Sequence, residues 1–474
     1  MDGLECSVIC LSQLTELGRL DAEYFSKENI HIESRLSYLH SSTIGNIATV
    51  VASAFYPAAT QLYSIGDTPF IRCVDCISFP VITSSQEERF EKIPLSFALE
   101  QNGIHLLQKG DIVITKVGTP CFASVVDDYE TVALSRTVLG LKNINNDINP
   151  YYLMVFLRSK YGFEQLMRQR ELTIQYQLTL DRVKSIRIYL ASDRLQEDIS
   201  EIVKKSISYV KLANERYGDA EQLMLQEMSI SIPVLATDNI SIKSFSESFE
   251  RTGRLDAEYY QPKYDAYKQH VLNYVGGYTT PGKEFELIKT KCTRELDEYP
   301  YVEIGDIDIN TGSSNYNIVA TEDLPANAKI MTKSGDLLIS TVRPYRGAVS
   351  ILTHNDLLVS GAFTVLREKG TYPAQTLQVL FRTSLYKDWF LKFDVGTSYP
   401  VIKDDDVLNI PIPVFRDSVH YQIKRFIQKS QLLLKKSKLF LEAAKQAVEM
   451  AIEKNEESAI KWLNERMSEI EEMA

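Results

Sequence analysis

Two stretches of this 474-residue chain are nearly identical and decide its organisation. Residues 18–25 read Gly-Arg-Leu-Asp-Ala-Glu-Tyr-Phe and residues 253–260 read Gly-Arg-Leu-Asp-Ala-Glu-Tyr-Tyr, with seven identities in eight positions at a separation of 235 residues. Self-similarity over such a distance indicates a duplicated domain. The length points the same way, because one ordinary hydrophobic core does not extend over so many residues.

The likeness continues beyond this motif with small shifts in offset. Loop insertions and deletions in two diverged copies of one domain produce such shifts. The further matches are 70–77 with 301–308, 109–115 with 334–340, and 183–188 with 407–412. We therefore expect the chain to consist of two copies of one domain.

Each copy is predicted to have three parts. A helical arm around the repeated motif comes first, and a mixed core of short strands bounded by Gly, Pro and Asp follows, with an inner helix at 151–168 or 374–390. A long helix ends each copy, at 192–228 and 416–474. The first would be about 55 Å long. Its narrow apolar seam predicts a partner helix, which the second can supply; the alternative is that each helix docks on its own domain.

Composition is that of a folded globular protein, with 44% hydrophobic and 24% charged residues. The formal net charge of −11 argues against strong, sequence-independent binding to nucleic acid by the chain alone. The longest weakly polar stretch, 44–59, is interrupted by Asn46, Ser53 and Pro57, and the first ten residues lack the basic start of a secretory signal. We expect a cytoplasmic protein without a membrane span.

No motif predicts catalysis, a metal or a cofactor. Cys73 and Cys76 have zinc-ligand spacing, but the repeat aligns them with Ile304 and Ile307, which favours small buried apolar groups. The tetrapeptide 149–152, Asn-Pro-Tyr-Tyr, resembles the Asn-Pro-Pro-Tyr motif of amino-methylating DNA methyltransferases but lacks the second Pro and a Gly-rich loop. A phosphate-binding GxxxxGK[ST] loop is absent from the sequence, and the acidic run 404–406 is interpreted as a capped turn.

The twin arms, together with a strand that leads into a long helix at the end of each copy, resemble the DNA specificity subunit of type I restriction-modification systems. In the second copy the strand that leads into the long helix reads Asn-Ile-Pro-Ile-Pro-Val at 409–414. Gly-Asp-aliphatic strands followed by the loops 116–119 and 343–347 are similar to that family's target-recognition domains, as is Gly-Thr-Ser-Tyr-Pro-Val-Ile at 396–402. The first copy departs from the pattern at 173–177 and 188–190, so the resemblance does not identify its recognition loop.

The resemblance implies an α+β fold class, in which two repeated mixed α/β target-recognition domains are separated by two long antiparallel coiled-coil helices. Each domain would read one half of a bipartite site in double-stranded DNA. The helices would set the spacing and dock methyltransferase subunits, and through these a restriction–translocase subunit. The implied parts are an arm at 1–40, recognition domain 1 at 41–191, helical spacer 1 at 192–228, a second arm at 229–275, recognition domain 2 at 276–415 and helical spacer 2 at 416–474.

An independent physical argument fits this role, because half-sites on DNA lie at distances fixed by a helical repeat of about 34 Å per turn. A protein that reads two of them needs two similar readers and a spacer. The alternative function is a non-catalytic two-domain scaffold of a defence or chromosome-associated assembly with little DNA binding of its own.

Candidate DNA contacts follow from local charge and from amide and aromatic side chains. Residues 151–191 hold seven basic and three acidic groups. Gln can pair with adenine, and an Arg on the loop fixed by Pro344 and Gly347 can pair with guanine. Solvated loops with surface salt bridges are the alternative. The candidates are Lys116, Thr119, Arg158, Lys160, Arg168, Arg170, Gln175, Tyr176, Gln177 and Arg182 in the first copy, and Thr341, Arg343, Tyr345, Arg346, Thr397, Ser398, Tyr399 and Lys403 in the second.

The final helix is polarised in charge. Residues 416–441 carry seven basic groups and one acidic group, whereas residues 442–474 carry four basic and nine acidic groups. An acidic end such as 465–472 would suit a basic surface on another subunit, and a solubilising charged face is the alternative.

Overall fold

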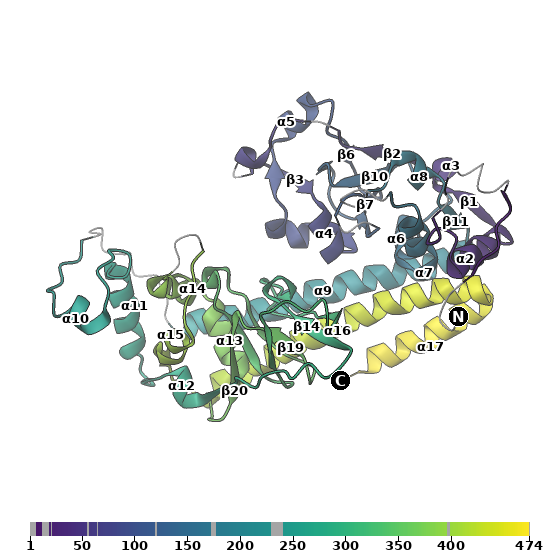
Figure 1. The fold of residues 1–474 in the computed structure, drawn as a ribbon. Coiled ribbons are helices and arrows are strands. Elements are labelled where there is room, and N and C mark those ends of the chain that lie inside the picture. Colours follow the sequence, from purple (N-terminus) through teal and green to yellow (C-terminus); the bar gives the residue numbers. More distant parts are fainter. Residues whose placement is uncertain are drawn as a thin grey trace. The chain divides into compact units, whose positions relative to one another are not determined.

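The structure is a computed structural model that describes residues 6–11, 19, 21–54, 56–63, 65–118, 121–171, 177–228, 240–395 and 399–473. The chain forms two compact units, Met1–Lys211 with Lys435–Ala474 and Leu212–Leu434. Figure 1 shows a mixed α/β fold with the two predicted long helices, α9 (Asp193–Glu227) and α16 (Asp417–Glu453). Each long helix contributes to both units, so the domain boundaries drawn from the sequence stay predictions. Among the described residues, no helix has the length and apolar character needed to span a membrane.

The first unit is built on two sheets and a two-stranded ribbon. The five-stranded sheet has the order β2 (Thr49–Ala52), β10 (Val138–Lys142), β7 (Ile112–Thr115), β8 (Ala123–Val126), β4 (Val81–Ile82). The four-stranded sheet has the order β5 (Lys92–Ile93), β3 (Thr68–Ile71), β9 (Val132–Leu134), β6 (Leu106–Leu107), and the ribbon pairs β1 (Ser41–Thr43) with β11 (Arg187–Tyr189). The helices are α2 (Lys27–Ser37), α3 (Ile44–Ile47), α4 (Cys73–Ser78), α5 (Leu95–Glu100), α6 (Pro150–Arg158), α7 (Lys160–Arg168), α8 (Leu180–Lys184) and α17 (Glu456–Glu472).

The second unit repeats this plan. Its two sheets have the orders β13 (Phe285–Leu287), β20 (Phe363–Glu368), β17 (Leu337–Ser340), β18 (Val349–Ile351) and β15 (Asn317–Ala320), β14 (Glu298–Val302), β19 (Leu358–Ser360), β16 (Ala328–Met331). A ribbon pairs β12 (Tyr278–Thr279) with β21 (Ile412–Pro413). The helices are α10 (Phe249–Thr252), α11 (Pro262–Leu272), α12 (Pro281–Glu284), α13 (Ala374–Arg382), α14 (Ser384–Phe390) and α15 (Asp404–Asn409), with a short 3-10 helix η4 (Pro344–Arg346).

Equivalent turns in the two units show why the repeated Gly-Asp pairs persist. Gly110 and Gly335 adopt positive φ angles of 88° and 93°, which favour glycine. The carboxylate of the following Asp accepts the N–H of the residue three positions before it, at 2.8 Å in both units. The turn therefore aims β7 and β17 into their sheets, where every residue of both strands is buried.

The inner helices differ from the prediction of one continuous helix in each copy. Residues 151–168 form α6 and α7, and residues 374–390 form α13 and α14. The breaks fall at Ser159 and Thr383, whose hydroxyls donate to the carbonyls of Phe156 and Leu380 at 2.6 and 2.7 Å. Such local side-chain bonds compete with the helical backbone pattern, and here they accompany the change of direction.

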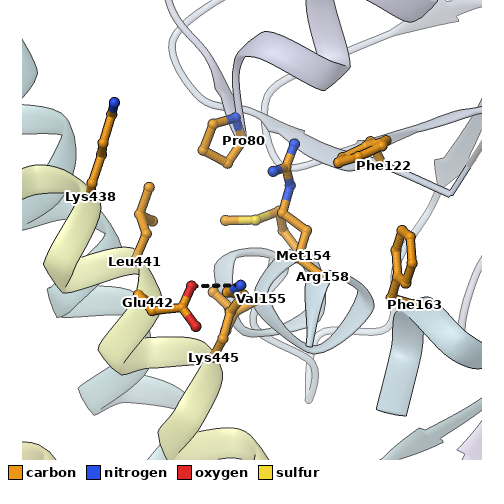
Figure 2. Close-up of a pocket in the computed structure, with 10 residues that line it drawn as sticks. All are labelled: Pro80, Phe122, Met154, Val155, Arg158, Phe163, Lys438, Leu441, Glu442 and Lys445. Carbon is orange, nitrogen blue, oxygen red and sulfur yellow. Dashed lines mark ion pairs between the residues drawn. The ribbon is translucent and has the colours of Figure 1, made fainter. Parts of the chain in front are cut away.

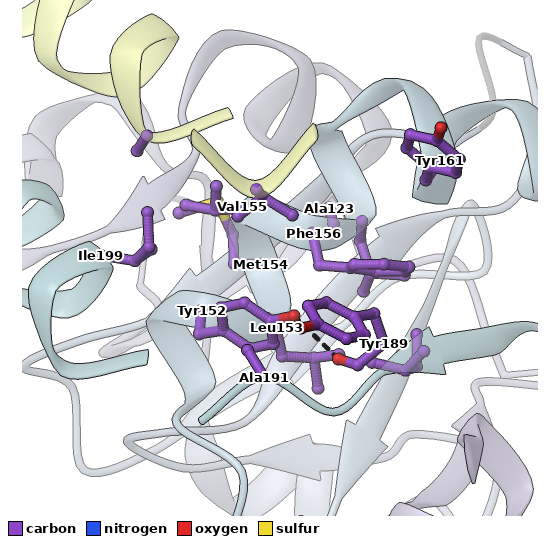
Figure 3. Packing of buried hydrophobic residues seen from close by; sticks show 14 of the residues in the cluster. Ala123, Tyr152, Leu153, Met154, Val155, Phe156, Tyr161, Tyr189, Ala191 and Ile199 are labelled. Carbon is purple, nitrogen blue, oxygen red and sulfur yellow. Dashed lines mark hydrogen bonds between the residues drawn. The ribbon is translucent and has the colours of Figure 1, made fainter. Parts of the chain in front are cut away.

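The packing of α6 fixes its place in the first unit. Six consecutive residues from Tyr152 to Leu157 are buried, more than the single apolar stripe of a surface helix. The Tyr152 hydroxyl donates to the Tyr189 carbonyl at 2.8 Å, so the one polar group on this buried ring has a partner (Figure 3). The ribbon strand β11 is thereby tied to α6.

The long helices pack against each other, as predicted. In the first unit the hydroxyls of Ser206 and Ser437 lie 2.7 Å apart and are buried, so a shift in register would leave both without a partner. In the second unit Ser430 donates to the Ala213 carbonyl at 2.8 Å, and Arg416 pairs with Glu227 at 2.7 Å. Rising numbers on α9 meet falling numbers on α16, which confirms the antiparallel arrangement.

The prediction of a single helix over 416–474 is wrong, because the chain turns back after α16. Asn455 accepts the Ser458 N–H at 2.8 Å and starts α17, which lies beside α16 (Figure 1). The Arg35 guanidinium donates to the carbonyls of Ile452 and Glu453, at 2.8 Å each, and ends α16. The acidic end expected to face another subunit instead meets this chain, since Glu471 pairs with Lys205.

Replacing Asn455 with Ala should destabilise α17 by about 1 kcal/mol, because the side-chain acceptor of the N-cap is lost. Hydrogen exchange of the α17 amides should become faster while that of α9 stays unchanged. Asn464→Ala, an exposed position within α17, is the matched control and should leave the exchange unaltered. Equal exchange in the two variants would show that Asn455 does not hold this turn.

Candidate nucleic-acid interface

The same pairing of two loops occurs in both units. In the first, Val117 forms a bridge with Gln177, and the Leu178 N–H donates to the Lys116 carbonyl at 3.1 Å. In the second, Val342 forms a bridge with Val401, and the Ile402 N–H donates to the Thr341 carbonyl at 2.9 Å. Candidates about 60 residues apart in the sequence are therefore brought together at the end of β7 and at the end of β17.

The second unit holds the better-defined site. Arg343 adopts the left-handed backbone region, with φ 51°, and its N–H donates to the Pro400 carbonyl at 2.7 Å. Such a conformation costs a non-glycine residue about 1–2 kcal/mol, so the surrounding loop must enforce it. The guanidinium carbon lies 4.3 Å from the centre of the Tyr399 ring. Stacking orients the planar guanidinium and leaves its edge available for a bidentate contact.

Other candidates surround this stacked pair. Tyr399 and Tyr345 are 54% and 39% exposed, and Arg346 and Lys403 are exposed as well. The Lys403 backbone N–H donates to the Asp406 carboxylate at 2.8 Å, which starts α15. Thr341 is half-buried, and its hydroxyl already donates to the Ala362 carbonyl at 2.8 Å. Thr397 and Ser398 lie outside the described residues.

The equivalent loop of the first unit has different chemistry. Gln177 is exposed and Lys116 is half-buried at the bridge. Thr119, Gln175 and Tyr176 lie outside the described residues. An amide therefore occupies the position that Val401 takes in the second unit.

Arg158 is a correction to the candidate set, because its side chain is used inside the first unit. The guanidinium donates to the carbonyls of Ala123 and Cys76 at 2.5 and 2.6 Å, and burial lowers the pKa of Arg158 to about 10. Arg382 is its counterpart, 5% exposed, and donates to the Ile309 carbonyl at 2.5 Å. The twin pairs Arg158-Ser159 and Arg382-Thr383 in the repeat were the sequence signal for this role.

Arg168 and Arg170 are also corrections, since they hold the N-terminal arm. The Arg168 side chain is 7% exposed, donates to the Tyr24 carbonyl and pairs with Glu33, both at 2.7 Å. Arg170 pairs with Glu23 at 3.3 Å. Lys160 and Arg182 remain candidates, because their partners Glu28 and Glu171 form exposed ion pairs that cost little to replace.

The repeated motif acts as a clasp, which we define as Arg19 with Asp21 and Arg254 with Asp256. Each Arg meets both carboxylate oxygens of its Asp, at 2.8 and 2.9 Å in the first unit and at 2.8 and 2.6 Å in the second. Each guanidinium also lies over the Tyr of the motif, 4.5 or 4.6 Å from the ring centre. Each guanidinium also donates to a backbone carbonyl near the end of the inner helices. The acceptor is Arg168, the last residue of α7, at 3.3 Å in the first unit, and Asp394, which follows α14, at 2.8 Å in the second.

The other chemistry-bearing groups are structural. Cys76 is fully buried in an apolar cluster, and burial raises the pKa of its thiol. Among the described residues, no group of three or more His, Cys, Asp and Glu side chains could hold a metal ion. A cavity of about 480 Å³ in the first unit is lined mainly by apolar groups such as Phe122, Met154 and Leu441, with a Glu442–Lys445 ion pair at its rim (Figure 2).

Comparison with known proteins gives distant structural likenesses. A scan against family models finds no match, and neither does a sequence search of curated proteins. Among solved structures, the chain is similar to the type I restriction-modification S subunit from M. genitalium, with 11% identity, a TM-score of 0.39, and coverage of 87% of this chain and 94% of that one. The chain is also similar to the HsdS subunit from Thermoanaerobacter tengcongensis, with 15% identity, a TM-score of 0.27, and coverage of 87% of this chain and 94% of that one. At this level the likenesses do not fix what the chain does.

The clasp predicts a pH-dependent contribution to stability. Hydrogen bonding to Arg19 and Arg254 lowers the pKa of Asp21 and Asp256, so the contribution is present above the unfolded pKa near 4 and is lost as the pH falls through the lowered pKa. Both pairs are partly exposed, so we expect about 0.5–1 kcal/mol for each.

The variant Asp21→Asn/Asp256→Asn should therefore melt below the wild type near neutral pH and approach it as the pH falls below about 4. Melting temperatures over this range measure the difference. Asp181→Asn, at a highly exposed carboxylate, is the control and should track the wild type throughout. A constant gap between the clasp variant and the wild type would mean that the carboxylates do not act through their charge.

Proposed function

We propose that this chain is the DNA specificity subunit of a type I restriction-modification complex and that each unit reads one half of a bipartite site. The single observation that carries the proposal is the loop pairing that recurs in both units, at Lys116–Leu178 and Thr341–Ile402. Two similar frames that present different exposed side chains are what two different half-sites require.

The side chains fit base recognition in the major groove. Arg343, stacked on Tyr399, can donate two hydrogen bonds to guanine O6 and N7, and Gln177 can pair with adenine N6 and N7. Arg346 and Lys403 are exposed beside Arg343 and can contact phosphates. The different chemistry in the two units would give the two halves of the site different sequences.

Catalysis is assigned to partners. The antiparallel pair α9 and α16 would act as the spacer and as the docking platform for methyltransferase subunits, which in turn would hold a restriction–translocase subunit. At 35 residues, α9 is about 52 Å long. The net charge of −11 fits a subunit that binds DNA tightly only at its own site and with its partners attached.

A scaffold that binds proteins and touches DNA little or not at all is the second candidate. The exposed apolar side chains of Ile242 and Phe245, 91% and 60% exposed, favour a protein partner for the segment before α10. Gel-shift measurements with and without a co-expressed methyltransferase separate the two functions, because the scaffold itself would add little or no shift of DNA in either case.

Exchange of residues 41–191 for another recognition domain should change one half of the methylated site and leave the other half intact. The exchange is structurally reasonable, because β1 and β11 pair at its two ends, with Ser41 opposite Tyr189. Methylation sequencing of cells that express the complex gives the result. A change in both halves, or in neither, would rule out the bipartite model.

Replacing Arg343 with Ala should weaken binding of the complex to its site by about 1–3 kcal/mol and relax the sequence preference at one base pair of the second half-site. Arg343→Lys should keep the charge and still lose the preference, since an ammonium lacks the planar fork. Arg251→Ala, an exposed Arg in α10 of the same unit, is the control. An unchanged methylation motif and affinity in Arg343→Ala would remove this loop from the interface.

A further inference from the structure

A second group of basic side chains lies in the second unit, outside the candidates that the sequence suggested. Four cationic residues line an open depression of about 680 Å³, which we call the lysine groove. The remaining lining residues are small, apolar or sulfur-containing, and none of the lining residues, all described, is acidic. The four cationic residues are Lys289, Lys291, Arg294 and Lys329.

Backbone pairing holds the groove in shape. The chain at 290–292 runs beside the edge strand β16, with the Met331 N–H donating to the Thr290 carbonyl and the Cys292 N–H to the Lys329 carbonyl, both at 2.9 Å. Ile330 is 6% exposed and packs into a buried apolar cluster, which holds β16 against the core of the unit. Lys291 and Lys329 therefore project from two paired segments, and both are exposed.

The charges of the groove are only partly compensated within the chain. Lys289 pairs with Asp404, and the Arg294 guanidinium donates to the carbonyls of Pro325 and Ala328 at 2.9 and 3.2 Å. Among the ion pairs of the described residues, none joins Lys291 or Lys329 to a carboxylate. A depression lined by cations and by no acidic side chain carries a positive potential, which favours a bound anion.

The groove touches the candidate reading loop at two points. Gly361 lines it, and the next residue, Ala362, accepts both the N–H and the hydroxyl of Thr341, two positions before Arg343. Asp404, the partner of Lys289, follows Lys403 and also accepts from Thr364 at 2.7 Å. Cations of the groove and the stacked Arg343 thus belong to adjoining parts of one surface.

We propose that the lysine groove binds phosphates of the duplex DNA backbone next to the bases that the Arg343 loop reads. The inference rests on the proposed function and deepens it, because phosphate contacts fix the register in which base contacts are made. An ammonium suits a phosphate as a compact point charge. The first copy lacks the counterparts of Lys289 and Lys291, because residues 53–71, which follow the equivalent strand β2, contain no Lys or Arg. Only the second half-site would have its backbone phosphates bound in this way.

The test is the salt dependence of binding by the full chain, alone and with the subunits that co-purify with it. The probe is a mixed-sequence duplex of about 40 base pairs, titrated by fluorescence anisotropy over roughly 20–150 mM KCl. Lys291→Gln/Lys329→Gln should reduce the slope of log K against log salt by about 0.9 for each lost phosphate contact, or about 1.8 in all. Its affinity at the lowest salt should fall at least about tenfold.

Two variants make the comparison specific. Lys268→Gln/Lys283→Gln removes two exposed lysines of the same unit that do not line the groove, and it should keep the wild-type slope to within the change expected of the net charge alone. Lys291→Arg/Lys329→Arg should restore binding, because the positive charges remain. Melting temperatures of all variants check that the fold is retained.

The outcomes separate the groove from the proposed function. If the wild type binds with a salt-dependent affinity and the Gln variant of the groove matches it in slope and affinity, the groove is not a phosphate site, although DNA binding stands. If the wild type, in either preparation, binds at no salt either the mixed-sequence duplex or a duplex that carries the site methylated in cells expressing the complex, the proposed function fails, and the groove proposal fails with it.

Discussion

The backbone pairing that joins the end of a buried strand to a distant loop is the constraint on which the rest of this structure depends. In each unit the strand after the Gly-Asp turn is fully buried, so its end cannot shift without moving the sheet. The bonds from Leu178 to Lys116 and from Ile402 to Thr341 then fix a second loop beside it. A loop held on one side alone would sample many conformations. Held on both sides, Arg343 can keep a left-handed backbone and a stacked guanidinium, which a base-reading group needs before DNA arrives.

The duplication divides the residues into those that hold the frame and those that differ at the exposed loops. Gly110 and Gly335, the two clasps, and the internal pair Arg158 and Arg382 make equivalent contacts in the two units, because they satisfy turns, helix ends and carbonyls that any version of the domain contains. The loop bridge is shared, yet it carries Gln177 in one unit and Val401 in the other. A frame of this kind lets exposed side chains change without loss of stability, which is the physical condition for readers with different sequence preferences.

The sequence was sufficient for the organisation of the fold and insufficient for the roles of individual cations. The repeat predicted two similar units, the apolar seams predicted the antiparallel pair of helices, and the aligned Gly-Asp strands predicted the two loops. Local charge placed Arg158, Arg168 and Arg170 on the surface, whereas backbone carbonyls and the arm occupy them. Carbonyl acceptors have no signature in a sequence. The breaks at Ser159, Thr383 and Asn455 were missed for a related reason, since one hydroxyl or amide decides them against an otherwise helical pattern. Lys291 and Lys329 lie 38 positions apart and become neighbours only through the pairing beside β16.

The proposed DNA binding is compatible with an acidic net charge once the range of each charge is considered. At about 0.1 M salt the Debye length is about 10 Å, so acidic groups beyond that distance would do little to a phosphate bound in the lysine groove as we propose. The net charge would instead weaken non-specific binding, in which no cations are aligned with phosphates and few counterions are released. It therefore lowers affinity for random DNA more than affinity at a site where the cations and the Arg343 loop engage together. Because specificity is a ratio of these two affinities, the acidic surface of the proposed reader would raise its specificity without any added contact to a base.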